Sequence, residues 1–283
     1  MRDEVPLFDM VEFSLTELCN RTCNFCPRYD AKVYPNRDLH MDFGLYKKII
    51  CELGDIGYQD VIVYSGFGEP LLYKNIFEAI QLAREKCPEA RIDLKTNGDF
   101  LNVENMKKLF EKGLSLLHIS LYDGSQFIEK FEDMIEKAGL DEEHVKLRVR
   151  FLHEEEKYGL IISNRGGMVN KEVCPPLETP MNNCCYYPFY TFFIDFDGKV
   201  LLCPHDWGKK LVLADANNET LVEIWNSDKM NEIRARLNIR DRDFGPCDVC
   251  NVNGTMYGQK KYEAWQLYMA KKNEKMEEYP IQI

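Results

Sequence analysis

The sequence predicts an α/β fold: an incomplete parallel barrel of the (β/α)6 type, followed by a smaller C-terminal region of a hairpin and helices. Three observations lead to this prediction. Short apolar segments alternate with helical segments over the first 165 residues. The alternation stops where a stretch rich in Cys, Pro and Gly begins. A Phe196-Asp197-Gly198 turn then separates two further apolar runs, which is typical of a β-hairpin.

The expected strands of the barrel are short and apolar. They cover residues 11–15, 61–64, 91–95, 116–121 and 145–151, with 158–162 as a candidate sixth strand. Helical spacing of apolar residues predicts helices over residues 43–53, 75–86, 103–112 and 125–137. Strands that alternate with helices form parallel βαβ units, and five or six such units fit a partial barrel better than an eightfold one.

The rest of the chain has a different pattern. Residues 166–188 are expected to form a loop, 191–195 and 199–203 a hairpin, and 220–226, 227–237 and 255–275 helices. We therefore expect a barrel over residues 1–165, a second domain over residues 166–254 and a C-terminal helical segment over residues 255–283.

The composition is that of an ordinary globular protein, with 45% hydrophobic and 29% charged residues. A net charge of −11 argues against a nucleic-acid partner, and the basic residues Arg234, Arg236, Arg240 and Arg242 are interpreted as a solvated face. No apolar run is long enough to span a bilayer, and the first residues lack the apolar core of a secretory signal. We expect a cytoplasmic protein without a membrane partner.

The eleven cysteines are informative because disulfides are disfavoured in the cytosol, where clustered thiols point to metal binding or catalysis. They form two groups, apart from Cys51 and Cys87, which we interpret as small buried hydrophobic residues. The groups are Cys19, Cys23 and Cys26 near the start, and Cys174, Cys184, Cys185, Cys203, Cys247 and Cys250 in the last 110 residues.

The first group has the spacing C-x3-C-x2-C and directly follows the strand expected at residues 11–15. Thiolates are the usual ligands of iron–sulfur clusters, which normally take four, so three cysteines leave one iron free for a small molecule. The alternative is a zinc site. Zinc sites favour paired C-x2-C units or His partners, and neither follows at suitable spacing.

With the aromatic Phe25 just before the third cysteine, this motif resembles the hallmark of the radical S-adenosylmethionine (SAM) superfamily. The resemblance implies that Cys19, Cys23 and Cys26 hold a [4Fe–4S] cluster whose open iron binds SAM, and that Phe25 lies near the adenine. It also implies that an electron from a donor such as flavodoxin or ferredoxin cleaves SAM to a 5′-deoxyadenosyl radical, which removes hydrogen from a substrate.

Further candidate cofactor-binding residues follow the next three expected strands, so parallel strands would bring them to one rim. Gly66-Phe67-Gly68-Glu69-Pro70 resembles the family segment that meets the SAM ammonium, which implies roles for Gly66, Gly68 and Glu69. Asn97, in Thr96-Asn97-Gly98, resembles a polar strand end that approaches SAM in the family. Ser120 is a candidate contact to the ribose or carboxylate, with backbone capping as an alternative.

The second group combines C-x12-G-x4-C, from Cys185 through Gly198 to Cys203, with the C-x2-C pair Cys247 and Cys250. Spacing alone leaves a zinc site open. The layout, together with residues 213–227, resembles the SPASM/twitch appendage of radical SAM proteins. Because no cysteine follows Cys250, the resemblance implies the shorter twitch form with one auxiliary [4Fe–4S] cluster. Cys184 competes with Cys185, and we prefer Cys185 since adjacent thiols on a strand point to opposite faces.

A few residues remain as candidates outside the two cysteine motifs. Arg165 is a candidate catalytic residue that could bind SAM or substrate oxygens, with a carboxylate-paired loop arginine as the alternative. Cys174 is a candidate hydrogen-atom donor or a small buried hydrophobe. His205 is a candidate substrate contact, and Tyr187 and Tyr190 are expected to pack in the core.

The function implied by the resemblance is that of a radical SAM oxidoreductase of the aminocyclitol dehydrogenase type. It would oxidise a sugar-like or cyclitol alcohol and pass an electron to the auxiliary cluster. No separate peptide-recognition domain precedes Cys19 in this sequence, which favours a small-molecule substrate. The alternatives are a radical SAM epimerase, a peptide-modifying enzyme and, from another class, a zinc-stabilised non-enzymatic binding protein.

Overall fold

One mixed β-sheet runs through the structure, a computed structural model that describes residues 6–150 and 162–278, with side chains to residue 272. The strands are β1 (Met10–Phe13), β2 (Val61–Tyr64), β3 (Arg91–Thr96), β4 (Leu116–Leu121), β5 (Val145–Val149), β6 (Thr191–Ile194), β7 (Lys199–Leu201) and β8 (Val212–Asp215). Their spatial order is β5-β4-β3-β2-β1-β6-β7-β8. The strands from β5 to β6 are parallel, and β7 and β8 are antiparallel to their neighbours.

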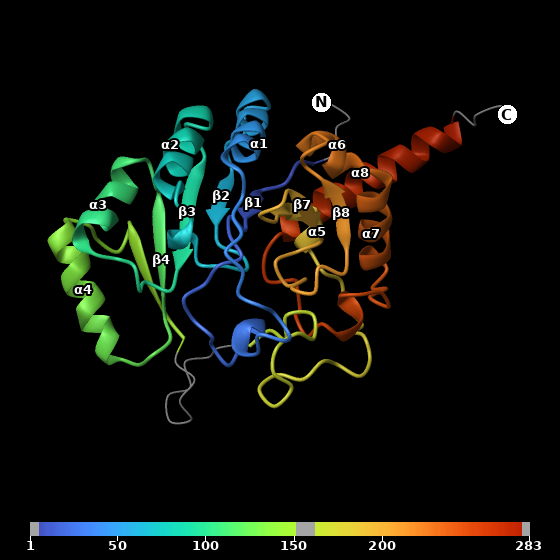
Figure 1. Ribbon diagram of the computed structural model, residues 1–283. Coiled ribbons are helices and arrows are strands. Elements are labelled where there is room, and N and C mark those ends of the chain that lie inside the picture. The colour runs from blue at the N-terminus through green and yellow to red at the C-terminus, as the bar shows by residue number, and fades with distance from the viewer. Residues whose placement is uncertain (1–5, 151–161, 279–283) are drawn as a thin grey trace.

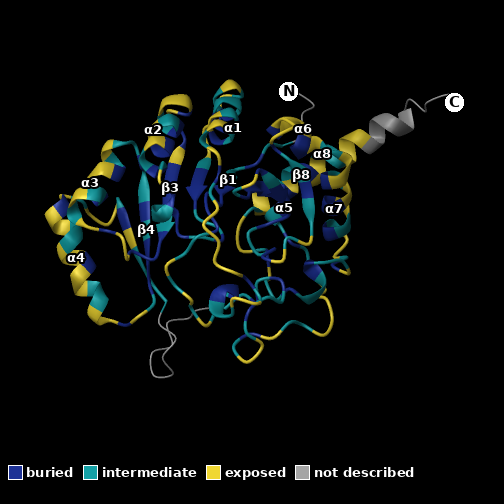
Figure 2. Cartoon of the chain, viewed as in Figure 1, coloured by how far each residue is buried: buried dark blue, intermediate teal, exposed yellow. Residues whose placement is uncertain are grey.

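Helices cover one face of the parallel part of the sheet (Figure 1). They are α1 (Phe43–Asp55), α2 (Ile76–Lys86), α3 (Val103–Glu111) and α4 (Gln126–Ala138). The C-terminal part adds α5 (Tyr187–Tyr190), α6 (Leu221–Asn226), α7 (Asp228–Asn238) and α8 (Gln259–Glu278). Helices α1 to α4 are amphipathic, with buried residues toward the sheet and exposed residues outward (Figure 2). No helix within the described ranges is both long and apolar enough to cross a membrane.

The fold class expected from the sequence is confirmed, with small shifts at element ends. The strands expected at 61–64 and 116–121 have those bounds, and the first strand begins at Met10 and ends at Phe13. The helix expected at 43–53 begins as expected because the Asp42 side chain accepts hydrogen bonds from the backbone of Gly44 and Leu45. The candidate sixth strand at 158–162 lies, except for Ile162, outside the described residues.

The sequence did not reveal how the C-terminal hairpin joins the rest of the molecule. Its first strand, β6, pairs in parallel with β1, so β1 lies inside the sheet rather than at its edge. The physical reason is a shared core: Phe192 and Ile194 of β6 are buried with Val11 and Phe13 of β1. Strand β8 was also not expected, because its short sequence lacks a clear two-residue alternation.

Side chains alternate along the parallel strands between the helix-covered face and the opposite face. On the helix side, Val11, Phe13, Ile92, Leu94 and Leu117 belong to the hydrophobic core. The opposite face carries Glu12, Ser14, Asp93, Lys95, His118, Ser120 and Arg148. Parallel sheets are usually apolar on both faces, so a polar face indicates that something other than a hydrophobic layer covers it.

The interpretation of the C-terminal arginines as a solvated face is wrong for two of them. Arg234 and Arg242 are buried, because backbone carbonyls inside the C-terminal part accept their hydrogen bonds. The Arg234 guanidinium also lies 4.0 Å from the centre of the Trp225 ring. Helical spacing alone does not distinguish these buried arginines from their exposed neighbours.

Candidate active site and thiol-lined cavities

A cavity of about 490 Å³ opens on the polar face of the sheet, at the ends of the parallel strands. This volume lies within the range of about 300–1,000 Å³ that is usual for small-molecule sites. Residues predicted from the sequence that line it are Cys19, Cys23, Phe25, Cys26, Gly66, Gly68, Glu69, Asn97, Ser120 and Arg165. Side chains from five separate stretches of sequence are thus brought to one site, as expected for the rim of a parallel barrel.

The cysteine loop leaves β1 and is held in shape by backbone hydrogen bonds. The amide of Cys26 donates to the carbonyl of Cys23 at 3.0 Å. The Asn36 side chain donates to the Cys19 carbonyl and accepts from the Cys19 amide, both at 2.9 Å. Burial raises the pKa of all three thiols, that of Cys23 to about 12. Three half-buried thiols on one tight loop are a donor set suited to an iron–sulfur cluster.

A buried guanidinium ties this loop to its surroundings. Arg28 is 3% exposed, and it donates to the carbonyl oxygens of Phe67 and Glu17 and to the side chain of Asn36. The guanidinium carbon of Arg28 also lies 4.9 Å from the centre of the Tyr34 ring. Because these acceptors are in the turns after β1 and β2, Arg28 fixes the two turns relative to each other. No motif in the sequence indicates this role.

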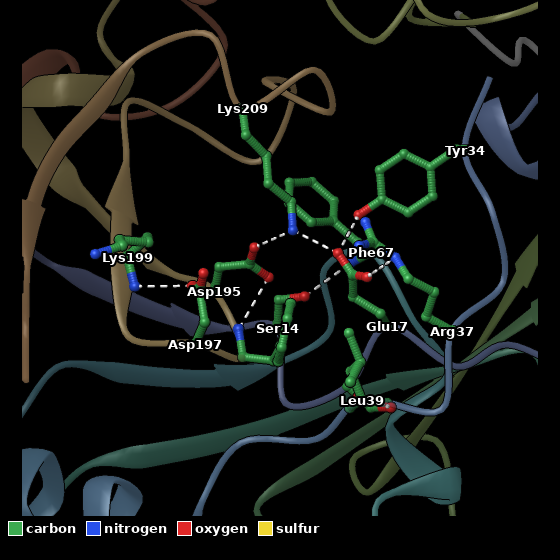
Figure 3. A network of polar contacts seen from close by, with 12 residues as sticks. Ser14, Glu17, Tyr34, Arg37, Leu39, Phe67, Asp195, Asp197, Lys199 and Lys209 are labelled. Atoms are coloured by element: carbon green, nitrogen blue, oxygen red, sulfur yellow. Dashed lines mark hydrogen bonds and ion pairs between the residues drawn. The ribbon is translucent and has the colours of Figure 1, made fainter. Parts of the chain in front are cut away.

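A second polar network connects the same loop to the C-terminal part (Figure 3). The Lys209 ammonium lies 2.5 Å from a carboxylate oxygen of Glu17 and 2.6 Å from one of Asp195. Arg37 binds the other oxygen of Glu17 at 2.9 Å. Both carboxylate side chains are fully buried. Burial alone would lower the pKa of Lys209, but Asp195 and Glu17 raise it, so the cation is held in its charged form.

The turn after β2 needs its glycines because it packs closely against the chain after β1. A side chain at Gly66, which has φ +93°, would lie 2.5 Å from the Ser14 side chain. At Gly68 a side chain would lie 2.2 Å from the Thr16 carbonyl oxygen. This close packing places Glu69 at the cavity, and a bulkier turn would move it away.

Glu69 is a buried carboxylate with well-defined partners. It accepts hydrogen bonds from the Thr96 hydroxyl at 2.6 Å and from the amide of Asn97 at 2.9 Å. Burial nevertheless raises the pKa of Glu69 to about 7, and these hydrogen bonds only partly offset that effect. A carboxylate that is costly to ionise in isolation favours a cationic ligand.

Other predicted residues complete the rim. The Asn97 side chain donates to Asn20 of the cysteine loop at 2.8 Å, so it joins the ends of β1 and β3. The Phe25 ring lies 5.1 Å from the Tyr122 ring, at the end of β4 near Ser120. Arg165 reaches the cavity from a loop in which it adopts φ +51°, a left-handed conformation that is uncommon for residues other than glycine.

A second cavity is enclosed by four thiols: Cys185 before α5, Cys203 after β7, and Cys247 and Cys250 on a short helical turn. All four are buried. Among the described residues, no three His, Cys, Asp or Glu side chains converge closely enough to hold a single metal ion. Four thiols around one cavity therefore fit a larger group such as an iron–sulfur cluster better than a zinc ion.

Charge around the second cavity also fits an anionic thiolate centre. The buried guanidinium of Arg242 lines it, and its Nε has no hydrogen-bond partner among the described residues. The positive charge of Arg242 opposes the effect of burial on the pKa of Cys185, Cys247 and Cys250. Gly254 is required here, because a side chain would lie 2.4 Å from the Cys185 sulfur.

Two other cysteines, Cys174 and Cys184, line neither cavity. The Cys184 sulfur faces the Asn238 carbonyl at 3.6 Å and the Tyr262 hydroxyl at 3.5 Å, which favours Cys185 as the cavity thiol. The Cys174 sulfur lies 3.4 Å from the Ile162 carbonyl and 3.2 Å from the Asn251 amide nitrogen. A role of Cys174 as a hydrogen-atom donor stays a prediction, without a contact to the cavity in its support.

Tyr187 and His205 line both cavities and therefore form a wall between them. The Tyr187 hydroxyl lies 3.0 Å from His205 Nε2, and the Ser163 hydroxyl lies 2.9 Å from Nδ1. Burial, with the positive charges of Arg165 and Lys95, lowers the pKa of His205 to about 3, so the ring is neutral. Tyr187 and Tyr190 were expected only to pack in the core, but both also line the larger cavity.

Sequence reasoning missed five basic residues that line the larger cavity. They are Arg21 and Arg28 of the cysteine loop, Lys95 on β3, Arg148 on β5 and Arg150 just after it. A signal was present. Lys146, Arg148 and Arg150 occupy alternate positions in and just after β5, and the residues between them are apolar, whereas strands of parallel sheets are usually apolar on both faces.

Comparison with known proteins agrees with this arrangement. A family model described as the radical SAM superfamily matches residues 13–162, and one described as an iron-sulfur cluster-binding domain, SPASM, matches residues 184–251. The chain is 31% identical over 245 residues to an S-adenosyl-L-methionine-dependent 2-deoxy-scyllo-inosamine dehydrogenase of Niallia circulans. That alignment covers 86% of this chain and 92% of the relative.

Solved structures give the same result. The crystal structure of BtrN in complex with AdoMet and 2-DOIA matches with a TM-score of 0.76 and 28% identity, covering 90% of this chain and 98% of that one. A structure of anSMEcpe with bound AdoMet matches at 13% identity with a TM-score of 0.57, which shows similarity of fold alone.

Proposed function

The chain belongs to the radical SAM superfamily and is an oxidoreductase of the dehydrogenase type, and we propose that it oxidises a secondary alcohol of a sugar-like or cyclitol substrate. It uses SAM with a [4Fe–4S] cluster and, in its SPASM region, an auxiliary cluster. The 2-deoxy-scyllo-inosamine dehydrogenase and the BtrN complex support the choice of a small-molecule alcohol.

We assign Cys19, Cys23 and Cys26 to the SAM-binding cluster and Cys185, Cys203, Cys247 and Cys250 to the auxiliary cluster. The donor sets support this division, since three thiols line an open cavity and four enclose a small one. We further assign residues 1–165, 166–254 and 255–283 to the partial barrel, the twitch domain and a C-terminal helix.

When bound, SAM and the clusters supply a radical that takes a hydrogen atom from the substrate carbon and an acceptor for the remaining electron. The chain's own residues bind and orient. Glu69 would attract the SAM ammonium, because its buried carboxylate has no cationic partner among the described residues. Phe25 and Ser120 would position the adenine and ribose, and Arg165 the oxygens of SAM or substrate.

The observation that carries the dehydrogenase proposal is the shared wall between the two cavities. Only Tyr187 and His205, of the residues described above, line both. Oxidation of an alcohol removes one hydrogen atom, one proton and one electron, so an electron acceptor close to the substrate is required. An epimerase instead needs a hydrogen-atom donor at the substrate. The thiols that line the larger cavity, among described residues, are the three assigned to the cluster.

The test is anaerobic turnover of the reconstituted protein with 2-deoxy-scyllo-inosamine and related alcohols in deuterated water. We expect a product two mass units lighter and one 5′-deoxyadenosine per product. Product of unchanged hydrogen count that carries one solvent deuterium at carbon would replace the dehydrogenase proposal with epimerisation.

Flavodoxin or ferredoxin would serve as electron donor, and we expect the protein in the cytoplasm.

A further inference from the structure

We propose that this enzyme acts on an anionic alcohol, a substrate that carries a phosphate ester or carboxylate in addition to the hydroxyl to be oxidised. The proposal rests on the proposed function and specifies its substrate class. The anionic group would bind to four basic residues that line the larger cavity, Lys95, Arg148, Arg150 and Arg165. We call these four residues the cationic wall. Of these residues, only Arg165 was a candidate from the sequence, as a contact to SAM or substrate oxygens.

The cationic wall is made by neighbouring strand ends on the polar face of the sheet. Lys95 is on β3, and Arg148 is two strands away on β5, beside Ser120 of β4 in the strand register. Arg150 follows β5 on the same face as Arg148, because side chains alternate along a strand. Arg165 enters from the loop beside His205, with Nη1 3.4 Å from His205 Nδ1. Four cationic groups thus converge on one cavity in a chain of net charge −11.

These cations lack partners that would explain them structurally. Among the described residues, none of the four has a carboxylate within 4.0 Å, whereas the nearby Arg21 and Arg91 are paired with Asp99 and Asp93. Arg148 is half-buried, and burial together with the charges of Arg150 and Arg165 lowers its pKa. Like charges that repel each other in a partly dehydrated cavity destabilise the free protein unless an anion binds there.

Bound SAM does not account for the cationic wall. SAM carries one carboxylate, which its own ammonium and sulfonium outweigh, so it adds no net negative charge. The protein carboxylates lining the cavity are Glu12 and Glu69, and among the described residues neither forms an ion pair with the cationic wall. Glu69 is assigned to the SAM ammonium, and Glu12 accepts a hydrogen bond from the Ser65 hydroxyl. At most one cation is matched by the SAM carboxylate. Arg165 is also close enough to Cys26 to oppose the effect of burial on the pKa of that thiol, so the cluster thiolates can match its charge. This leaves at least two of the four cations for the substrate. Oxygen-rich anions suit arginine, whose planar guanidinium donates two parallel hydrogen bonds.

Calorimetric titration of the anaerobic, SAM-loaded holoenzyme without reductant tests the proposal. The ligands are myo-inositol 1-phosphate, glucuronate and neutral myo-inositol. We expect one or both anions to bind at least about tenfold more tightly than myo-inositol, and added salt to weaken that binding. Preference for the phosphate or for glucuronate identifies which anionic group the substrate carries.

Variants locate the site. Arg148→Gln, and independently Lys95→Gln on another strand, should weaken anion binding roughly tenfold to hundredfold and leave myo-inositol binding nearly unchanged. Lys146→Gln is the matched control, since Lys146 is on β5 but is exposed and does not line the cavity. Thermal unfolding and the cluster absorbance of each variant show whether it is folded and loaded.

The proposal is overturned if the anions bind no more tightly than myo-inositol, if they do not bind, or if folded Arg148→Gln and Lys95→Gln proteins bind them as the unmodified enzyme does. Cleavage of SAM by the unmodified enzyme is measured separately. A protein that cleaves SAM but does not prefer anions contradicts only this inference. One that binds anions but does not cleave SAM contradicts the proposed function instead.

Discussion

The two thiol-lined cavities use the same donor atom for opposite purposes. In the larger cavity, three half-buried thiols from one short loop share an open space with charged and aromatic side chains. In the second cavity, four buried thiols from three segments enclose a small space with mostly apolar walls. Three donors leave a coordination position for a ligand, and four do not. In the proposed assignment, donor number and access therefore distinguish the SAM-binding site from the auxiliary cluster.

The two cavities also differ in how they are held. The cysteine loop is fixed by hydrogen bonds from Asn36 and Arg28 and by the network around Glu17. The four thiols of the other cavity depend on the hairpin, on Arg242 and on close packing at Gly254. Substitutions that act on one cavity and spare the other test this comparison.

The largest effect is expected for Cys23→Ala. Loss of one of three donors on the loop should abolish SAM cleavage, to below about one hundredth of the unmodified rate. The measurement is 5′-deoxyadenosine release under reducing, anaerobic conditions. Cys51→Ala is the control, because Cys51 is on α1 and lines neither cavity. Continued cleavage by the Cys23→Ala protein would remove the assignment of this loop.

The next effect separates the cavities. Cys185→Ala should reduce iron from about eight to about four atoms per chain and stop product formation, while SAM cleavage continues. Cys184→Ala should keep all the iron, because its thiol points toward Asn238 and Tyr262. Iron and sulfide analysis with 5′-deoxyadenosine release measures both. Iron loss from the Cys184 variant rather than the Cys185 variant would reverse the choice between these neighbours.

The network in Figure 3 connects the two regions, and its cation should matter for stability. Lys209→Met would leave the carboxylates of Glu17 and Asp195 buried, with Glu17 paired only to Arg37. The expected loss is about 3 kcal/mol of unfolding free energy, measured by denaturant titration. Lys199→Met, which removes the exposed pair with Asp215, is the control and should change stability far less. Equal effects of the two substitutions would mean that the network does not join the regions.

The smallest effect concerns pH. The pKa of Glu69 is raised to about 7, so the carboxylate is protonated below that pH and its attraction for the SAM ammonium is lost. SAM affinity should therefore fall roughly tenfold between pH 8 and pH 6. The affinity is measured by equilibrium binding of SAM to the cluster-loaded protein, with cluster absorbance recorded at each pH. Glu69→Gln should bind more weakly and without this pH dependence. An unmodified enzyme whose affinity is flat over this range would exclude Glu69 as the partner.

The extent to which sequence predicts this molecule differs between local and distant features. The strands and helices of the first half were predictable because each has its own periodicity, as at Val61–Tyr64 and Leu116–Leu121. The cysteine loop and the Gly66–Glu69 turn were predictable because motif and turn are local in sequence. The pairing of β6 with β1, the buried Arg234 and Arg242, and the contact of Lys209 with Glu17 were not, since each depends on residues far apart in the chain.

The cationic wall falls between these cases. The alternation of Lys146, Arg148 and Arg150 was visible, but only the fold shows that Lys95 and Arg165 join them at one cavity. Charged residues at alternate positions of an otherwise apolar strand are therefore a usable sequence signal for a lined cavity in such barrels.

The parallel pairing of β6 with β1 has a consequence for synthesis on the ribosome. Met10–Phe13 is translated early, whereas its neighbour Thr191–Ile194 emerges only after the whole barrel sequence. Until then β1 has an unpaired backbone edge, and Glu17 lacks Lys209. We expect folding of the N-terminal half to wait for this late strand, so that metal loading of the first cysteine loop follows translation rather than accompanying it.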